Sequence, residues 1–572
     1  MVDGIVRTAP ALQLALGLIP KEPRRSPEEK RGVVYTKPWV VDLILDLAGY
    51  IPDRDLAGTF AVEPAAGDGA FLVAMARRLV TSCHRWQRPL SAITNSLLAY
   101  ELDEESAERA RIAVASALRS LGVPSSAAES LASGWVCTGD YLMASPCLPA
   151  ADFVIGNPPY IRLENMDAFQ AASYRKVYQT MRGRADIYIA FYEAALRQLK
   201  PNGVCAFICA DRWMFNQYGA ELRRLVTEGY AVDSVIEMHR TDAFADDVSA
   251  YPAITVIRNG QQGPVMVARL SQQAALAGEH ITTDVFQRLQ DDGKTAPADV
   301  GIQATWVKHW FTGPDPWPLV EPARLALLKE LEERFDPLES PQTGTKVGIG
   351  VATGADDIFI TTDPALVEPS RLLPLAMAAD TTSGRLLWSK HYLVNPWSPS
   401  GLVDLDQYPQ LAAYLGRHRE RLLQRHVGRK NPHAWYRTID RVNYSLLHRP
   451  KLYIPDIKDQ LNPALDTGET YPHHNLYYIH SDAWDLEVLG GLLMSAIGQF
   501  FVECYGVRMR GGYLRFQAQY LRRIRVPRPQ DISPAQRAAL IHAFRQRDRE
   551  LATQVALEVY RIPRGSTELV VR

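Results

Sequence analysis

The segment Val62-Glu63-Pro64-Ala65-Ala66-Gly67-Asp68-Gly69-Ala70-Phe71 determines the fold class predicted for the first half of this chain. It joins a strand-like run at 59–62 to a run with helical spacing at 70–79. Gly67 and Gly69 let the backbone turn tightly and approach a ligand closely. Position 72 is Leu, where a dinucleotide-binding turn has its third glycine. The turn therefore favours a nucleoside ligand without a pyrophosphate, and the alternative is an ordinary strand–helix connection.

Strand and helix patterns alternate on both sides of this turn. Apolar runs predict strands at 59–62, 96–100, 135–138, 152–155, 204–210, 235–238 and 253–257. Helical spacing predicts helices at 39–48, 70–79, 104–121 and 187–199. Alternation of this kind is typical of an α/β, doubly wound, Rossmann-like sheet.

Changes in pattern divide the chain into five predicted parts. We expect an N-terminal arm or short helix at 1–34, a catalytic domain at 35–260 and a connecting segment at 261–320. A second domain of mixed α+β structure follows at 321–530, and a C-terminal helix at 531–572. The turn-rich sequence at 259–264 (NGQQGP) sets the first boundary. Ser533 before Pro534 is a helix cap, and one long amphipathic helix is predicted from there to about Tyr560.

Composition excludes several classes of protein. The 572 residues include 63 Lys and Arg against 64 Asp and Glu, and 47% are hydrophobic, which is typical of a globular chain. Six scattered cysteines exclude a disulfide scaffold and form no zinc pattern, so we expect no metal and a reducing, cytoplasmic setting. No apolar stretch reaches the roughly 18 residues of a membrane span.

Two basic stretches lie in the second half. Residues 416–451 have a net charge of +8 and contain Trp435-Tyr436, and residues 505–528 carry seven Arg and no acid. One such stretch is as well explained by a solvated surface. Two of them, mixed with glycines and aromatic residues, favour a face that contacts nucleic-acid phosphates.

Acidic residues follow two successive predicted strands. Glu101 lies just past the second predicted strand, where an acid can accept hydrogen bonds from both hydroxyls of a ribose. Asp140 follows the third strand and can take an adenine amino group, with Leu102 and Tyr141 on the two faces of the ring. Each acid alone is better explained as a helix cap, but together they outline a nucleoside pocket.

Asn157-Pro158-Pro159-Tyr160 follows the apolar strand at 152–155. The prolines fix φ and remove two donors, so the loop is rigid. The Asn157 side-chain oxygen and the Pro158 carbonyl can accept both hydrogens of one amino group, and Tyr160 offers a flat face for stacking. The alternative is a rigid proline turn capped by asparagine.

With these motifs in order, the sequence resembles the N6-adenine DNA methyltransferases of the gamma arrangement, the TaqI-like and Eco57I-like group. Tyr35-Thr36-Lys37-Pro38 resembles the segment that contacts the methionine part of S-adenosylmethionine (SAM), and Arg184-Ala185-Asp186-Ile187-Tyr188 resembles the motif opening the next helix. Phe244 resembles the aromatic residue that helps to hold the flipped base. The segments 347–354, 450–454 and 509–516 look like landmarks of the family's target recognition domain.

The resemblance implies three sets of site residues. The catalytic set is Asn157, Pro158, Tyr160 and Phe244. The SAM-binding set is Thr36, Glu63, Pro64, Ala65, Gly67, Asp68, Gly69, Phe71, Glu101, Leu102, Asp140, Tyr141 and Asn157. The DNA-binding set is Arg425, Arg429, Lys430, Arg508, Arg510 and Arg515.

The implied function is methylation of adenine N6 in double-stranded DNA, with SAM as the methyl donor and the target base flipped out of the duplex. A monomer partnered by a separately encoded restriction endonuclease is the implied setting, and an orphan or phage-defence enzyme stays open. About 34 residues precede Tyr35, so we do not expect a nuclease domain in front of the first motif.

Rival hypotheses remain at this point. Related enzymes with the same tetrapeptide methylate glutamine in release factors, adenine in ribosomal RNA or cytosine N4 in DNA. The glutamine enzymes lack a large C-terminal domain, whereas about 300 residues follow Gly260 here. A non-catalytic DNA-binding subunit would carry a damaged SAM or Asn-Pro-Pro-Tyr motif, and neither motif is damaged.

Overall fold

The computed structural model describes residues 36–162, 165–183, 185–239, 241, 243–244, 251–270, 302–318, 320–506 and 514–571. The chain divides into two compact units, one up to Ala326 and one from Leu327. The arm or helix predicted at 1–34 lies outside the described residues.

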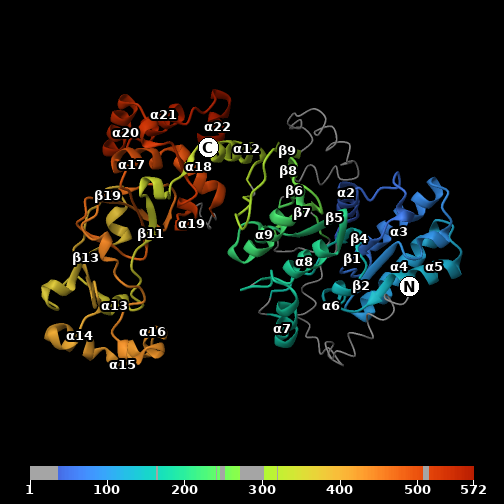
Figure 1. The fold of residues 1–572 in the computed structure, drawn as a ribbon, viewed down its shortest axis with the longest axis horizontal. Coiled ribbons are helices and arrows are strands. Elements are labelled where there is room, and N and C mark those ends of the chain that lie inside the picture. The colour runs from blue at the N-terminus through green and yellow to red at the C-terminus, as the bar shows by residue number, and fades with distance from the viewer. Residues whose placement is uncertain are drawn as a thin grey trace. The chain divides into compact units, whose positions relative to one another are not determined.

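The first unit is built on a nine-stranded sheet (Figure 1), in the order β3-β2-β1-β4-β5-β7-β6-β8-β9. The strands are β1 (Ala61–Glu63), β2 (Leu97–Glu101), β3 (Val136–Thr138), β4 (Ala151–Gly156), β5 (Leu199–Ala210), β6 (Ala231–Glu237), β7 (Pro252–Arg258), β8 (Val265–Leu270) and β9 (Ile302–Val307). The first five strands in this order, from β3 to β5, pair in parallel, and β7 is antiparallel to both of its neighbours. The predicted doubly wound sheet is confirmed.

The helices of this unit bury apolar faces against the sheet and one another. They are α2 (Pro38–Leu47), α3 (Ala70–Arg85), α4 (Glu104–Ser120), α5 (Ser125–Trp135), α6 (Tyr141–Ala144), α7 (Ala168–Val177), α8 (Tyr188–Gln198) and α9 (Ala220–Gly229). Pro38 begins α2, and Asp103 caps α4 by accepting from the Ser106 amide. The predicted helix at 187–199 ends as α8 at Gln198, because β5 already begins at Leu199 and continues through the Lys200–Gly203 turn signal.

The predicted boundary at residue 260 is wrong. The turn at 259–264 connects β7 to β8, and β8 and β9 extend the same sheet beyond β6. A Gly- and Gln-rich turn looks alike in a sequence whether it joins two strands of one sheet or two domains. Part of the predicted connecting segment at 261–320 therefore belongs to the sheet of the first unit.

The second unit consists of small sheets and short helices. Helix α12 (Pro322–Arg334) spans the boundary between the units. The strands are β10 (Asp336–Pro337), β11 (Lys346–Ile349), β12 (Ile360–Thr361), β13 (Leu372–Ala376), β14 (His391–Val394), β15 (Trp397–Ser398), β16 (Gly401–Leu402), β17 (Lys451–Pro455), β18 (Ile457–Lys458), β19 (Ala464–Asp466), β20 (Tyr471–Pro472), β21 (Leu476–His480), β22 (Leu514–Arg515) and β23 (Arg525–Val526). Two four-stranded sheets, β11-β21-β17-β19 and β12-β14-β13-β20, form its centre.

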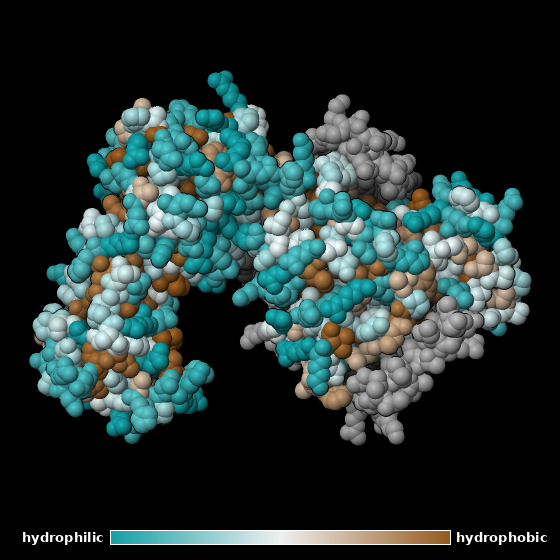
Figure 2. Space-filling view, viewed as in Figure 1, coloured by the Kyte–Doolittle hydropathy of each residue, from teal (hydrophilic) through white to brown (hydrophobic). Residues whose placement is uncertain are grey.

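The remaining helices of this unit are α13 (Asp356–Phe359), α14 (Pro409–Arg417), α15 (Arg419–Gln424), α16 (His426–Lys430), α17 (Leu486–Met494), α18 (Ala496–Tyr505), α19 (Ala518–Leu521), α20 (Pro534–Gln546), α21 (Arg549–Val559) and α22 (Thr567–Val571). On the face of each unit seen in Figure 2, polar residues cover most of the surface and apolar residues form scattered patches.

The single long helix predicted after Ser533 is also wrong. Ser533 caps α20 as expected, by accepting from the Gln536 amide. The helix ends at Gln546, because Arg547 takes a left-handed φ of 61°, and Asp548 caps the new helix α21. Helix α20 packs closely on α17, where a Cβ at Gly490 would lie 2.3 Å from the Phe544 ring. The C-terminal helices are thus part of the second unit.

Among the described residues, no single helix is long and apolar enough to cross a membrane. The pair α17 and α18 meets that test only when taken together, across a bend of 64°, and most of its residues are buried in the second unit.

Candidate active site

Four polar side chains lie at the carboxyl ends of four adjacent strands. Glu63 ends β1, Glu101 ends β2, Asp140 follows β3 and Asn157 follows β4. In the order β3-β2-β1-β4, the neighbours β1 and β4 are where the winding direction of the sheet reverses. Open α/β sheets bind ligands at this point.

The glycine turn between β1 and α3 needs both of its glycines. Gly67 and Gly69 have φ values of 53° and 92°, in the left-handed region that favours glycine. A Cβ at Gly69 would also lie 3.3 Å from the Ala110 backbone of α4. The Gly67 amide donates to Glu101 Oε2 at 2.9 Å, so the turn and the end of β2 form one structure.

Glu101 has the geometry of a hydroxyl-binding acid. Its Oε1 accepts from the Asp103 amide at 2.8 Å, so each carboxylate oxygen holds one backbone N–H and keeps a further acceptor site. Asp103, and not Glu101, caps the following helix. The side chain of Asp68 is turned to the surface of α4 instead, where its Oδ1 accepts from Arg109 Nε at 2.8 Å.

Glu63 is a buried acid beneath the glycine turn. It is 1% exposed, and its Oε2 has no hydrogen-bond partner within the described part of the chain. Burial, and then the nearby Glu101 carboxylate, raises the pKa of Glu63 well above its ordinary value. Pro64 and Phe71 are buried on either side of the turn, and Ala65 is half-buried. The Glu63 carboxyl also accepts a backbone hydrogen bond from Leu72, so only one of its oxygens lacks a partner in the described part of the chain. A buried acid with such an oxygen beside a glycine turn fits a ligand that carries a cationic group and a ribose.

The two predicted walls of the adenine pocket differ from each other. Leu102 is 46% exposed at the end of β2, in a position to cover a ligand. Tyr141 is 2% exposed, stacks on Phe191 at 5.8 Å and donates to Gln198 Oε1 at 2.8 Å. The ring of Tyr141 therefore packs in the core, because α6 directs it inward.

Asp140 has two roles in the structure. Its Oδ1 caps α6 by accepting from the Met143 amide at 3.3 Å, and its Oδ2 accepts from the Tyr174 hydroxyl at 2.7 Å. Burial raises its pKa, while these two hydrogen bonds oppose the shift. Tyr174 on α7 is not among the predicted site residues, and no motif in the sequence marks it.

The Asn157 side chain lies where three distant segments meet. Asn157 Nδ2 donates to Thr36 Oγ1 at 3.1 Å, and Thr36 forms an antiparallel bridge with Phe244. The Lys37 amide donates to the Ala243 carbonyl at 3.0 Å. These bonds place the start of α2 beside the loop after β6 and the loop after β4.

Tyr160 and Phe244 meet at this junction. Their ring centroids are 6.3 Å apart at an interplanar angle of 76°, and Tyr188 lies 6.3 Å from Tyr160 on another side. The Tyr160 hydroxyl donates to the Ile208 carbonyl at 3.3 Å, and burial raises its pKa well above the ordinary value. Pro158 is buried, while Asn157 and Tyr160 are half-buried. The residues predicted to hold a flipped base thus lie together.

The predicted DNA-binding residues fall into three groups, namely exposed residues, residues bonded within the second unit and residues outside the described part of the chain. Arg429 and Lys430 are exposed at the end of α16. Arg425 is half-buried, donates to the carbonyls of Thr353, Trp435 and Arg437, and lies over the Phe359 ring. Arg515 pairs with Asp456 at 2.6 Å. Arg508 and Arg510 lie outside the described residues.

Several charges of the basic stretch at 416–451 are neutralised within the second unit. Lys451 is fully buried against Asp466 at 2.7 Å, and Arg421 and Arg449 pair with Asp357 and Asp482. The net charge of +8 therefore overstates the charge available to a partner. The sequence pattern could not reveal this, because the acidic partners lie outside the stretch.

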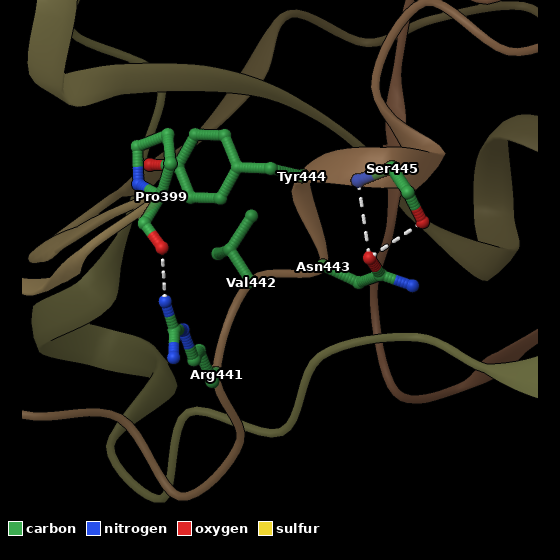
Figure 3. A pocket seen from close by; sticks show the side chains of 6 residues that line it. All are labelled: Pro399, Arg441, Val442, Asn443, Tyr444 and Ser445. Atoms are coloured by element: carbon green, nitrogen blue, oxygen red, sulfur yellow. Dashed lines mark hydrogen bonds between the residues drawn. The ribbon is translucent and has the colours of Figure 1, made fainter.

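Two open depressions lie in the same stretch. One, of about 430 Å³, is lined by Pro399 and residues 441–445 (Figure 3), with the Arg441 guanidinium donating to the Pro399 carbonyl. The other, of about 620 Å³, is lined by residues 416–421 and 424, including Arg417, Arg419 and Arg421. Arginine-rich concave surfaces suit phosphate groups.

The sheet order, the glycine turn and the acids at successive strand ends define the first unit as a Rossmann-like methyltransferase domain. Residues 150–244, which include the Asn-Pro-Pro-Tyr loop and Phe244, match the family described as Eco57I restriction-modification methylase. Curated relatives extend the likeness over nearly the whole chain.

Three type II methyltransferases are similar in this way. M.XhoI of Xanthomonas vasicola is 41% identical over 95% of this chain and 99% of its own length. M.PaeR7I of Pseudomonas aeruginosa is 42% identical over 93% of this chain and 92% of its own length. M.BstVI of Geobacillus stearothermophilus is 37% identical over 94% of this chain and 97% of its own length. A solved structure of the type IIL restriction-modification enzyme MmeI with DNA covers 93% of this chain and 72% of its own, at 12% identity and a TM-score of 0.47.

This chain belongs to the Eco57I family of type II DNA methyltransferases. It is a SAM-dependent, adenine-specific enzyme of a restriction-modification system. The rival hypotheses of a glutamine, ribosomal RNA or cytosine enzyme, or of a non-catalytic subunit, are therefore not needed.

Proposed function

We propose that Asn157, Pro158, Tyr160 and Phe244 form the pocket that receives a flipped adenine, and that Thr36 sets the orientation of the Asn157 amide. The observation that carries this proposal is the convergence of Thr36, Asn157 and Phe244, which come from segments more than 80 residues apart.

The chemical problem is the weak nucleophilicity of the adenine amine, whose lone pair is delocalised into the ring. Because Asn157 Nδ2 donates to Thr36, the Oδ1 atom on the other side of the amide is oriented as an acceptor for the substrate. Asn157 Oδ1 and the Pro158 carbonyl hold the two amine hydrogens, which favours a pyramidal nitrogen with its lone pair turned away from them. Rigid positioning supplies most of the rate enhancement.

The cofactor site extends along the strand ends. SAM supplies the electrophilic methyl group when it is bound. Glu101 accepts the ribose hydroxyls, and Asp140, beside Leu102, faces the adenine end of the cofactor. Gly67 and Gly69 let the backbone approach the ligand, and Glu63 balances the charge of its amino group.

The second unit recognises the DNA target in this proposal. Exposed cations, represented by Arg429 and Lys430, hold phosphates, while Arg425, Arg515 and Lys451 stabilise the unit. Arg508 and Arg510 stay in the proposed DNA-binding set on the strength of the sequence alone. We further propose that the enzyme acts as a monomer in the cytoplasm, beside a separately encoded endonuclease.

The decisive experiment is methylation-sensitive long-read sequencing of DNA from a host that expresses the chain. We expect N6-methyladenine at one recurring sequence with the parent chain, and none with Asn157→Ala produced at an equal level. N6-methyladenine at the same sites with Asn157→Ala would contradict the proposed catalytic role.

A further inference from the structure

Three side chains of the kinds that bind metal ions cluster in the second unit, and none of them belongs to the proposed methyl-transfer site. Asp356, His473 and His474 each place one ligand atom within 4.8 Å of the other two. His473 Nε2 lies 3.1 Å from Asp356 Oδ2, and the two imidazole centroids are 4.0 Å apart. The cluster joins residues 117 positions apart, so no short sequence pattern announces it.

The backbone around the cluster is fixed. The His473 amide donates to the Ala376 carbonyl at 3.0 Å, and the His474 amide donates to the Val351 carbonyl at 3.1 Å. The end of β11 approaches so closely that a Cβ at Gly350 would lie 2.2 Å from the His473 carbonyl. The Thr353 hydroxyl donates to Asp356 and sets its rotamer. The backbone at the two histidines and the Asp356 carboxylate are therefore held in place before anything binds.

Two imidazole nitrogens of this cluster have no hydrogen-bond partner among the described residues. His473 is 1% exposed, and the Nδ1 atoms of both His473 and His474 are buried with no hydrogen-bond partner among the residues that the structure describes. Orphaned buried nitrogens are costly and are rare without a ligand. Asp356 and His474 are half-buried, so an ion can reach the cluster from solvent.

We propose that Asp356, His473 and His474 bind one divalent transition-metal ion of the zinc type. Two imidazoles and one carboxylate favour Zn²⁺, Co²⁺ or Ni²⁺ over Mg²⁺ or Ca²⁺, which prefer oxygen ligands. Zinc ligands in a tetrahedron lie about 3.3 Å apart, from Zn–N and Zn–O bonds of about 2.0 Å. Small side-chain rotations bring the three atoms to that spacing, and a water completes the coordination.

The site has a structural role in this proposal. His473 directly follows β20, which belongs to the sheet β12-β14-β13-β20. His474 leads into β21 of the other four-stranded sheet, and Asp356 begins α13. An ion at this point fastens the two central sheets of the second unit together. It takes no part in methyl transfer.

The test uses the full-length chain after treatment with a chelator and dialysis. Equilibrium dialysis with Zn²⁺ alone, followed by elemental analysis, is expected to give one tightly bound zinc per chain. Asp356→Asn and His474→Gln are expected to weaken this binding at least about tenfold. His433→Gln changes an exposed histidine of the same unit and is the matched control, with binding like that of the parent.

Two further readouts separate this site from adventitious binding. Co²⁺ is expected to give visible absorption bands of a four-coordinate ion in the parent and in His433→Gln, without a thiolate charge-transfer band from any of the six free cysteines. Zn²⁺ is expected to raise the melting temperature of those two chains and not of the Asp356 and His474 variants. Absence of stoichiometric zinc in the parent, or equal binding by all four chains, would overturn the proposal.

Discussion

The side-chain amide of Asn157 donates through Nδ2 to Thr36 Oγ1 at 3.1 Å, across 121 residues of sequence. This bond links the loop after β4 to the segment before α2, which in turn bridges Phe244. An asparagine side-chain amide has a donor nitrogen and an acceptor oxygen. A hydrogen bond donated by the nitrogen therefore also fixes the direction in which the acceptor oxygen points. Thr36 is therefore a positioning residue for the catalytic acceptor in our proposal, as well as a neighbour of the cofactor.

Thr36→Val is expected to lower kcat by about a hundredfold, because the amide loses the partner that fixes its orientation and small errors of position are costly. Thr36→Ser keeps the hydroxyl and is expected to stay within a few-fold of the parent. Asn157→Ala is expected to abolish methyl transfer and leave SAM binding largely intact. Single-turnover methylation and SAM calorimetry measure the two effects separately, and equal kcat in Thr36→Val and the parent would remove Thr36 from this role.

Tyr160 is expected to act through its ring and not through its hydroxyl. Tyr160→Phe loses one long hydrogen bond to the Ile208 carbonyl but keeps the aromatic face, so substantial activity is expected. Tyr160→Ala loses stacking worth about 1–3 kcal/mol, and a much larger loss of activity is expected.

A 2-aminopurine at the target adenine reports base flipping by increased fluorescence. The increase is expected to survive Asn157→Ala and to fall in Tyr160→Ala. Phe244→Ala is expected to reduce both the fluorescence change and turnover, and if neither changes, Phe244 is only a core residue.

Glu101 is expected to contribute more to SAM affinity than Asp68. Glu101→Ala removes an acceptor from the cofactor and also the bond to the Gly67 amide, so a loss of about 1.5–3 kcal/mol is expected. Asp68 is paired with the exposed Arg109, and Asp68→Ala is expected to have a smaller effect. Calorimetry on the two variants gives the comparison, and unchanged affinity in Glu101→Ala would exclude that residue from the site.

The parts of the site that the sequence predicts are those set by local chemistry. The glycine turn, Glu101 and the Asn-Pro-Pro-Tyr loop each follow a strand that periodicity marks, and the sheet order then brings them together. The burial of the Tyr141 ring could not be predicted, because a four-residue helix turns it into the core and periodicity cannot resolve so short an element. Arg425 and Lys451 resemble surface charges in the sequence because their partners are carbonyls and acids at other positions of the chain. Position 260 resembles a boundary because turn chemistry is the same within and between domains.

Glu63→Gln is expected to stabilise the protein while weakening SAM binding. The folded-state pKa of Glu63 is raised, so the unfolded chain loses this proton at a lower pH than the folded chain does. The parent therefore loses stability as the pH rises from about 4.5 through the folded-state pKa, and Gln does not. The melting temperature of Glu63→Gln is expected to match the parent near pH 4.5 and to exceed it at pH 8. A lower melting temperature at pH 8 would show that the carboxylate has an ionised partner in the fold.

The last prediction separates phosphate-binding side chains from structural arginines within one basic stretch. Arg429→Ala and Lys430→Ala are expected to weaken DNA binding without changing the melting temperature, because both side chains are exposed. Removing one cation that neutralises a phosphate is expected to reduce the slope of log affinity against log salt by about 0.9. Arg425→Ala is expected to destabilise the second unit by about 1–3 kcal/mol, since it leaves the Trp435 and Arg437 carbonyls without this donor and leaves the Thr353 carbonyl with the Ile439 amide alone.

Arg421→Ala is the matched surface control, because this exposed arginine is paired with Asp357. Its effect on the salt slope is expected to be smaller than that of Arg429→Ala. Binding titrations at several salt concentrations, with thermal melts of the same preparations, provide both quantities. If Arg429→Ala and Lys430→Ala left the salt slope at the parent value, α16 would not bind phosphate, and the DNA face would have to lie elsewhere on the second unit.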